Sequence, residues 1–294
     1  MNEILEKYRV AGRVAAEARA YGSKLAVEGI PLLELVTEIE LFITKKGLKP
    51  AFPVNIGINN VTAHYTPSSN DKSILKKGDV VKIDLGTHLE GYIADTAITV
   101  EVGTDNYRNL IAASVEALNL ALELLKPALE VNVIGSCIEN VITARGFKSV
   151  RNLTGHSISQ YKLHGGKAIP NVRTSVADKI ELGEVLAIEP FATNGYGKVN
   201  ERGYGNIYRF VRDREPRSKE GKILVEYIKK NFHSLPFAER WCCGVVDNPQ
   251  LALRELTKEL IVARYPILQE VDNSVVAQTE HTVIVTERGC EIIT

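Results

Sequence analysis

The sequence has few cysteines, no net charge and no long run of apolar residues. Four cysteines stand among 294 residues, and they form no Cys-x-x-Cys pair of the kind that binds zinc. The 36 basic side chains balance 36 acidic ones, which gives no support for a nucleic-acid partner or an anionic membrane. No segment is apolar enough to span a bilayer or to serve as a signal peptide. We therefore expect a cytoplasmic protein with reduced, mostly buried thiols that binds neither nucleic acid nor membranes.

The apolar pattern predicts an α+β protein made of one domain, residues 1–294. Helical spacing marks residues 2–29, 29–47, 103–126 and 131–147, and a Pro- and Asn-rich loop is expected over 49–71. Strand-like segments cover 81–100, 185–193 and 275–286. Two helices followed by carboxylate-bearing strands occur twice, which suggests two structurally similar halves and a mostly antiparallel sheet. Residues 196–265 are interpreted as a helical insertion within this domain, opening on the turn-rich stretch "GYGKVNERGYGN".

Two aspartates lie in the apolar stretch "VKIDLGTHLEGYIADTAITV", at Asp84 and Asp95. If the connecting turn is even and centred between Leu89 and Glu90, the two residues pair directly across a hairpin on one face. Directly opposed carboxylates repel, so one of them must hold a proton or cations must lie between them. An odd turn would place them on opposite faces, and a turn cap or an exposed edge is the simpler alternative.

Further acids and histidines have the same unusual surroundings. Glu189 in "LAIEPF" and Glu280 in "AQTEHTVIV" are flanked by apolar residues, where a bare charge is costly. Oxygen ligands combined with an imidazole suit Mn, Fe, Co or Zn. Candidate histidines in Gly-containing turns are His64, His156 and His164. We expect His88 and His233 at the surface, and His281 to face away from its strand neighbour Glu280.

Five segments together resemble the signature segments of methionine aminopeptidases. They occur in the family's order and read "NNVTAHYTP", "VKIDLGTHLEGYIADTA", "RNLTGHSISQYKLHGGKAIP", "AIEPFAT" and "AQTEHTVIV". The residues around His156 and the insertion after Glu189 are similar to those of the type II branch, and the short N-terminus is similar to that of archaeal members. The resemblance implies the pita-bread fold, with pseudo-twofold halves around a curved antiparallel sheet with flanking helices, and a monomer.

The resemblance also implies a cofactor and its ligands. Family members bind two divalent metal ions, with Co, Mn, Fe or Zn as candidates here. Carried over by motif, Asp95 and Glu280 would bridge the two ions. Asp84 would hold one of them, and His156 and Glu189 would hold the other.

The implied reaction is the hydrolytic removal of the N-terminal methionine from peptides and nascent proteins, preferably when the next residue is small. A metal-activated hydroxide would attack the scissile carbonyl, with Glu189 as general base and then acid. His64 and His164 would contact the substrate and stabilise the intermediate. Phe52, Leu163 and Tyr265 would form the apolar slot for the methionine side chain. A further family histidine has no counterpart near Asn206 and Tyr208, so this part of the pocket is left open.

Two other functions are compatible with the same fold. A proline dipeptidase uses a similar ligand set but usually carries an extra N-terminal domain, whereas about 80 residues precede Asp84 here. A pita-bread protein that binds a partner without metal should have replaced some ligands, whereas all five are present in this sequence.

Overall fold

The computed structural model describes residues 2–294, and in them the helices follow the apolar periodicity of the sequence. In the second helix, for example, Leu32, Leu35, Ile39 and Ile43 form one buried stripe that begins directly after the N-cap residue Pro31. The helices are α1 (Asn2–Leu25), α2 (Leu32–Lys45), α3 (Arg108–Leu124), α4 (Val131–Ala144), α5 (Lys219–Phe232), η1 (Glu239–Cys242, a 3₁₀ turn) and α6 (Pro249–Lys258). The four predicted helices are therefore present, with ends shifted by a few residues.

Strands make up most of the remaining regular structure. They are β1 (Lys49–Ile58), β2 (Val61–Ala63), β3 (Val80–Leu89), β4 (Tyr92–Glu101), β5 (Lys148–Ser149), β6 (Thr154–Ile158), β7 (Ala168–Pro170), β8 (Val185–Ile188), β9 (Phe191–Thr193), β10 (Val199–Phe210), β11 (Phe237–Ala238), β12 (Val262–Glu270), β13 (Val276–Gln278), β14 (His281–Thr286) and β15 (Gly289–Ile292). Their sheet orders are β1-β3-β4, β11-β10-β12-β2, β13-β9-β5 and β15-β14-β8-β6-β7. Pairing between these strands is antiparallel.

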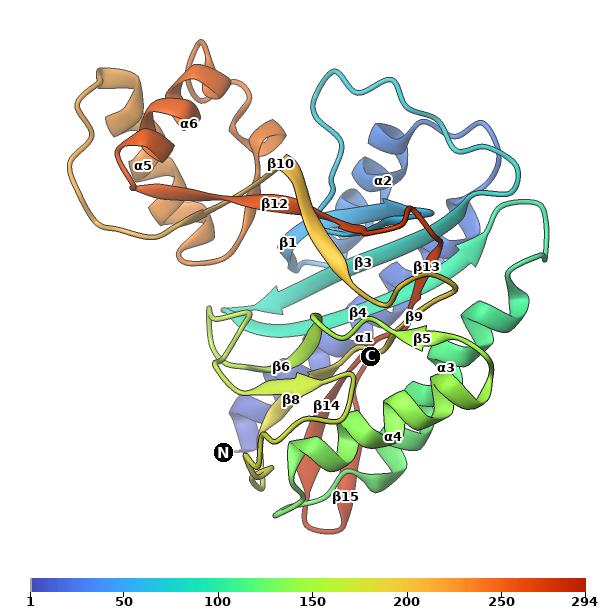
Figure 1. Ribbon diagram of the computed structural model, residues 1–294. Helices are drawn as coiled ribbons and strands as arrows, with labels where there is room; N and C mark the ends of the chain where they lie inside the picture. The colour runs from blue at the N-terminus through green and yellow to red at the C-terminus, as the bar shows by residue number, and fades with distance from the viewer. Residues whose placement is uncertain (1) are drawn as a thin grey trace.

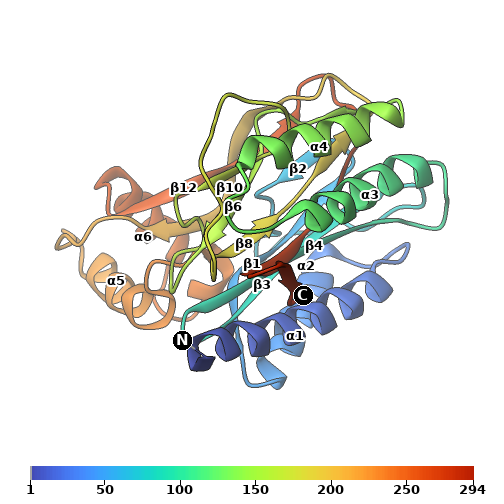
Figure 2. The ribbon, with the colours of Figure 1, turned by 90° about the horizontal axis from the view of Figure 1, so that it is seen from below.

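Two hydrophobic cores lie on the two halves of the chain. The first joins α1 and α2 to β1, β3 and β4, and the second joins α3 and α4 to β8 and β14. Figure 2 shows α1 on one side of the strands, with α3 and α4 on the other. The halves meet where Ala97 of β4 and Glu280, just before β14, exchange backbone hydrogen bonds. This arrangement confirms the predicted α+β pita-bread fold with a curved antiparallel sheet.

The hairpin of β3 and β4 has a different register from the predicted one. Asp84 pairs with Ala97, and Asp95 pairs with Gly86, so the two aspartates are diagonal neighbours instead of direct partners. The turn consists of Glu90 and Gly91, both with positive φ (53° and 85°), which is the geometry of a two-residue type I′ hairpin. The even turn was correct, but its centre lies one residue later than predicted. Both aspartates still share one face, within reach of a common ligand.

Two stretches predicted as irregular are strands. Residues 49–58 form β1 despite their two prolines, because β1 is an edge strand with register shifts between Pro50 and Phe52 and between Phe52 and Asn55. Proline is tolerated at edges and bulges, where no ladder donor is required. The "GYGKVNERGYGN" stretch is mostly the start of β10, which pairs with β12 with two register shifts.

Strands β10 and β12 lead to a lobe formed by α5, η1 and α6, seen at the upper left of Figure 1. This lobe has its own apolar cluster, which includes Leu224, Ile228, Phe237 and Leu253. Among the cysteines, Cys242 of this lobe is buried, Cys243 is exposed, and Cys137 and Cys290 are half-buried. The expectation of mostly buried thiols was wrong, although all four are unpaired. Residues 2–294 contain no helix that is both long and apolar enough to cross a membrane.

Candidate metal centre

Five predicted ligands converge on one cavity at the meeting point of the two halves. Asp84 comes from β3, Asp95 from β4 and His156 from β6. Glu189 lies at the break between β8 and β9, and Glu280 lies at the break between β13 and β14. Each glutamate was predicted within a continuous strand, but the chain changes sheet at both positions. The change of sheet turns each side chain into the cavity.

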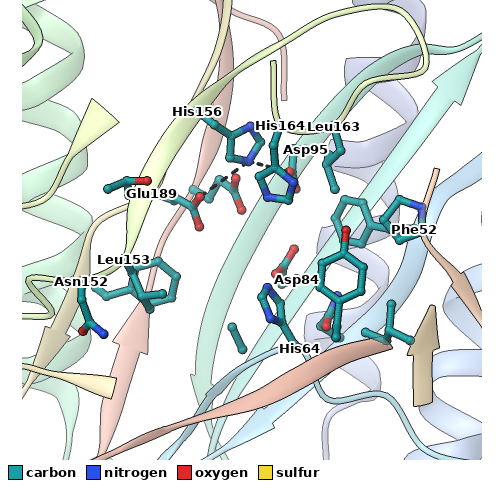
Figure 3. A pocket seen from close by; sticks show the side chains of 18 residues that line it. Phe52, His64, Asp84, Asp95, Asn152, Leu153, His156, Leu163, His164 and Glu189 are labelled. Carbon is teal, nitrogen blue, oxygen red and sulfur yellow. Dashed lines mark ion pairs between the residues drawn. The ribbon is translucent and has the colours of Figure 1, made fainter. Parts of the chain in front are cut away.

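The tightest group contains Asp95, His156 and Glu280, whose ligand atoms lie within 4.8 Å of one another. His156 Nε2 is 3.6 Å from Asp95 Oδ2 and 3.7 Å from Glu189 Oε1. Figure 3 shows this imidazole between the two carboxylates. The arrangement offers one nitrogen and several oxygens to a common point, which is a donor set for divalent ions of the first transition row.

Burial opposes ionisation of the four acids. It raises the pKa of Asp84 to about 7, and it raises the pKa of Asp95 well above its usual range, with repulsion from Asp84 adding to the effect. The pKa values of Glu189 and Glu280 are raised for the same two reasons. Four carboxylates in one largely buried cavity are thus unfavourable as anions unless positive charge joins them.

Unused hydrogen-bonding capacity points to the same conclusion. Among the described residues, Asp84 Oδ1, Asp95 Oδ1 and Glu280 Oε1 are buried and have no hydrogen-bond partner. Buried acceptors are normally satisfied, because leaving one unpaired costs about 1–3 kcal/mol. Divalent cations would satisfy these oxygens and neutralise the acids, so the residues present fit a metal site.

The histidines of the cavity are held neutral. Burial lowers the pKa of His156 to about 3, with repulsion from His164 contributing, and lowers the pKa of His64 to about 4. The short distances from His156 to Asp95 and Glu189 are therefore not ion pairs, because burial disfavours charge on both partners. A neutral imidazole has a free lone pair and can act as a metal ligand.

The residues predicted to bind substrate line the same cavity. They are Phe52, His64, Leu163, His164 and Tyr265. The His64 and Tyr265 rings meet edge to face at 5.2 Å, and the His156 and His164 rings lie 4.5 Å apart. Gly86 is required beside them, since a Cβ atom there would lie 2.4 Å from the Phe52 ring. The cavity volume of about 230 Å³ is at or below the small end for ligand pockets and suits the end of a peptide.

Several neighbouring residues were not predicted. The buried Gln278 donates its amide to Glu189 Oε2 at 3.3 Å. Its position two residues before Glu280, in a strand-like segment, was the signal that could have identified it. The rest of the wall is Asn55, Ala63, Asn152, Leu153, Thr154, Phe191, Ile207 and Pro236.

The three other histidines lie outside the cavity. His88 was expected at the surface, but it is buried and accepts the Gly91 N–H. His233 is exposed, as expected, and His281 faces Thr294.

A polar network behind the cavity fixes the backbone of two of the predicted ligands. The Thr282 hydroxyl donates to Asp95 O at 2.7 Å and accepts from Asp95 N at 2.8 Å. Arg19 of α1 reaches Thr96 Oγ1, which in turn donates to Glu280 O at 2.9 Å. Neighbours of this kind orient metal ligands and are needed for tight binding.

Comparison with known proteins identifies the family of this chain. The model of metallopeptidase family M24 matches residues 6–287. The methionine aminopeptidase of Methanocaldococcus jannaschii is 43% identical over 292 residues, which is 99% of each chain. Among solved structures, a thermophilic Arx1 gives a TM-score of 0.87 at 18% identity, covering 99% of this chain and 90% of that one.

A second solved structure is the methionine aminopeptidase of Thermotoga maritima, with a TM-score of 0.73 at 24% identity, covering 100% of this chain and 97% of that one. These two structural likenesses show the shared fold. The match to the family model and the full-length relative show the family. The chain belongs to metallopeptidase family M24 and is a metal-dependent hydrolase.

Proposed function

We propose that this hydrolase removes the N-terminal methionine from peptides and nascent proteins, preferably when the next residue is small. The observation that carries the proposal is the convergence of Asp95, His156 and Glu280 beside an apolar slot in one small cavity. Archaeal relatives named methionine aminopeptidase, aligned over almost the whole chain, support the choice of substrate.

Two divalent ions are proposed for the site. Asp95 and Glu280 would contact both ions, Asp84 would complete one set of ligands, and His156 with Glu189 would complete the other. When bound, such ions lower the pKa of a water molecule and polarise a carbonyl oxygen. Four carboxylates would balance the charge of two divalent cations, which supports a pair over a single ion.

Glu189 is proposed to accept and then return a proton. Its Oε2 is held by the Gln278 amide at 3.3 Å, so the carboxylate has a fixed orientation toward the cavity. Burial and nearby carboxylates raise its pKa, and a raised pKa makes a carboxylate a stronger base. His64 and His164 stand on the wall as neutral imidazoles that can donate a hydrogen bond to a carbonyl oxygen as it gains negative charge.

The methionine side chain is proposed to lie among Phe52, Leu163 and Tyr265. The three side chains line the same cavity as the carboxylates, so an apolar residue can occupy the slot while its amino end reaches the acids. A free, unprotonated amino group could be held by one of the proposed ions, whereas an internal peptide bond offers no such group, and this favours an exopeptidase over an endopeptidase.

The test uses the full chain, treated with chelator and then supplied with Mn, Co or Fe. A Met-Ala-Ser peptide and an Ala-Pro peptide are compared by measuring released amino acids. We expect methionine release that depends on added metal and is abolished by Glu189→Ala or Asp95→Ala. Absence of methionine release with every metal would overturn the proposal, and cleavage of Ala-Pro alone would identify a dipeptidase instead.

A further inference from the structure

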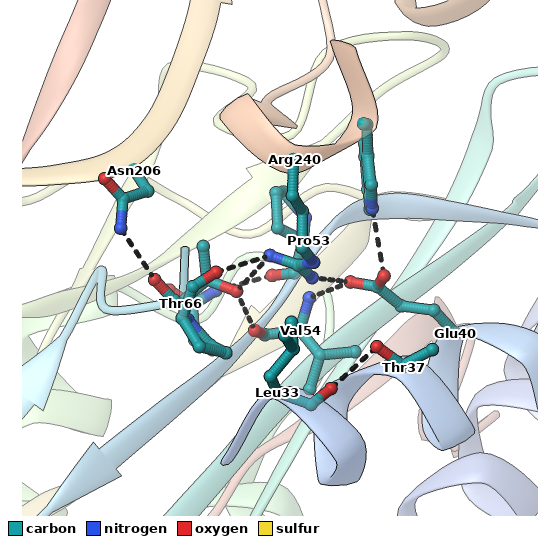
Figure 4. A network of polar contacts seen from close by, with 11 residues as sticks. Leu33, Thr37, Glu40, Pro53, Val54, Thr66, Asn206 and Arg240 are labelled. Atoms are coloured by element: carbon teal, nitrogen blue, oxygen red, sulfur yellow. Dashed lines mark hydrogen bonds and ion pairs between the residues drawn. The ribbon is translucent and has the colours of Figure 1, made fainter. Parts of the chain in front are cut away.

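A buried ion pair outside the metal centre joins the helical lobe to the first half of the chain. Arg240 of η1 pairs with Glu40 of α2, and their side chains are 7% and 12% exposed. Trp241 Nε1 donates to the other Glu40 oxygen at 2.9 Å. Arg240 also donates from Nη1 to Thr66 Oγ1 at 2.8 Å and to Pro67 O at 3.2 Å. We call Glu40, Thr66, Arg240 and Trp241 the latch (Figure 4).

The latch supplies hydrogen-bond partners at a bulge in β1, where backbone polar groups would otherwise be buried and unpaired. Between Phe52 and Asn55 the register with β3 shifts, so Val54 lies outside the paired positions. Its N–H donates to Glu40 Oε1 at 3.2 Å, and its carbonyl accepts from Thr66 Oγ1 at 2.8 Å. Phe52 and Asn55, on either side of this bulge, both line the cavity. The latch therefore sets the path of the strand that carries two cavity residues.

The latch also fixes the segment that carries His64. His64 has a positive φ of 63°, which an L-residue holds only when its surroundings impose it. Two residues later, Thr66 is fully buried, and its hydroxyl is held between Arg240 and Val54. Its carbonyl accepts from Asn206 Nδ2 at 3.3 Å. Thr66 thus ties the His64 turn to both the lobe and β1.

We propose that Arg240 is a positioning residue, which holds His64 and the β1 bulge in place through Thr66 and Glu40. The role rests on the proposed function, because His64 is the group on which activity would depend. The planar guanidinium uses two nitrogens, with Nη1 donating to Thr66 and Pro67 and Nη2 donating to Glu40, whereas a lysine carries its three donors on one nitrogen and cannot occupy both positions. Displacement of a positioned group by about 1 Å can cost on the order of 100-fold in rate.

The experiment compares Thr66→Val, Thr66→Ser and Arg240→Lys with the unchanged protein and with Arg212→Lys, an exposed arginine in the same lobe. Thr66→Val keeps the shape of the side chain but removes the hydroxyl group, whereas Thr66→Ser keeps the hydroxyl group. For the methionine-releasing reaction we expect kcat to fall about 10- to 100-fold in Thr66→Val and Arg240→Lys. Thr66→Ser and Arg212→Lys should stay within about threefold. Metal affinity, measured by calorimetry, should change less than about threefold throughout.

A second readout does not depend on activity. In protein labelled on its histidines, the His64 imidazole resonances, assigned with His64→Gln, should shift in Thr66→Val and Arg240→Lys, whereas those of the exposed His233 should not. Folded variants with unchanged kcat and an unchanged His64 spectrum would overturn the proposal. If the unchanged protein releases no methionine, the proposed function fails, and the histidine spectrum alone still decides whether the latch positions His64.

Discussion

Replacement of Asp84 by asparagine should make the metal-free protein more stable at neutral pH. Asparagine has nearly the same shape and no charge, so it removes an anion from a cavity that disfavours anions. Burial raises the pKa of Asp84 from 3.8 to about 7. At 1.36 kcal/mol per pKa unit, this difference corresponds to about 4 kcal/mol. The Asp84 side chain is partly exposed to solvent, so about 4 kcal/mol is an upper limit.

The sign of the effect follows from proton linkage. In the unfolded chain the carboxyl group ionises near pH 3.8, whereas in the folded chain it keeps its proton until about pH 7. Between these values the folded state binds more protons, so rising pH lowers the free energy of unfolding. The asparagine variant has no carboxyl group at this position, so its free energy of unfolding does not fall in this way. Its advantage should be near zero at pH 4 and reach its full value by pH 8.

Denaturant unfolding of both proteins after chelation, at pH 5, 6.5 and 8, measures this advantage directly. Added Mn²⁺ or Co²⁺ should narrow the difference, because a ligand at 100 times its Kd adds about 2.7 kcal/mol to a protein that binds it. The variant has lost one proposed ligand and should gain less. A variant that is less stable than the unchanged protein at pH 8 without metal, or a difference that does not vary with pH, would refute the reasoning.

Two further substitutions test residues around the site. Thr282→Val leaves the backbone N–H and carbonyl of Asp95 buried and unpaired. We therefore expect the free energy of unfolding to fall by about 2 kcal/mol and the metal Kd to rise about tenfold. Thr282→Ser keeps the hydroxyl and should be near normal in both. Calorimetric metal titration checks this, and an unchanged Kd in folded Thr282→Val contradicts it. His88 has a pKa lowered to about 4 by burial, so below pH 6.5 the unfolded chain takes up its proton first and stability falls as the pH drops. His88→Asn should remove up to about 3 kcal/mol of this loss between pH 7 and pH 4, and equal slopes for both proteins in acid unfolding would contradict the assignment.

Local patterns in the sequence predicted the helices and the shared face of the two aspartates. The stripe of α2 is visible because a helix buries every third or fourth residue whatever it packs against. The predicted hairpin register was wrong: Asp84 pairs with Ala97, two residues beyond the predicted partner Asp95. The position of the turn depended on Glu90 adopting a positive φ, which the sequence does not indicate. Strand β1 was missed because its prolines are tolerated only at an edge, and edges are a property of the assembled sheet.

The functional surroundings depended more strongly on long-range contacts. The convergence of the five ligands followed from a family resemblance and not from the spacing of the residues. The latch could not be predicted, since Glu40 and Arg240 are separated by 200 positions and neither lies in a distinctive motif. His88 was placed wrongly because one turn of the hairpin and the neighbouring Tyr161 cover it, and neither contact is apparent from adjacent residues.

The contact between the two halves, where Glu280 meets β4, also implies an order of events during synthesis. Glu280 follows Thr96 by 184 positions, so the carboxylates of the first hairpin leave the ribosome long before their partner from the second half. At about 5–20 residues per second, this interval lasts about 10–40 s. During that time the early hairpin carries acids without their counterparts and cannot form the complete donor set. Completion of the donor set is therefore a late step in the biogenesis of this chain, which follows the closure of the two halves.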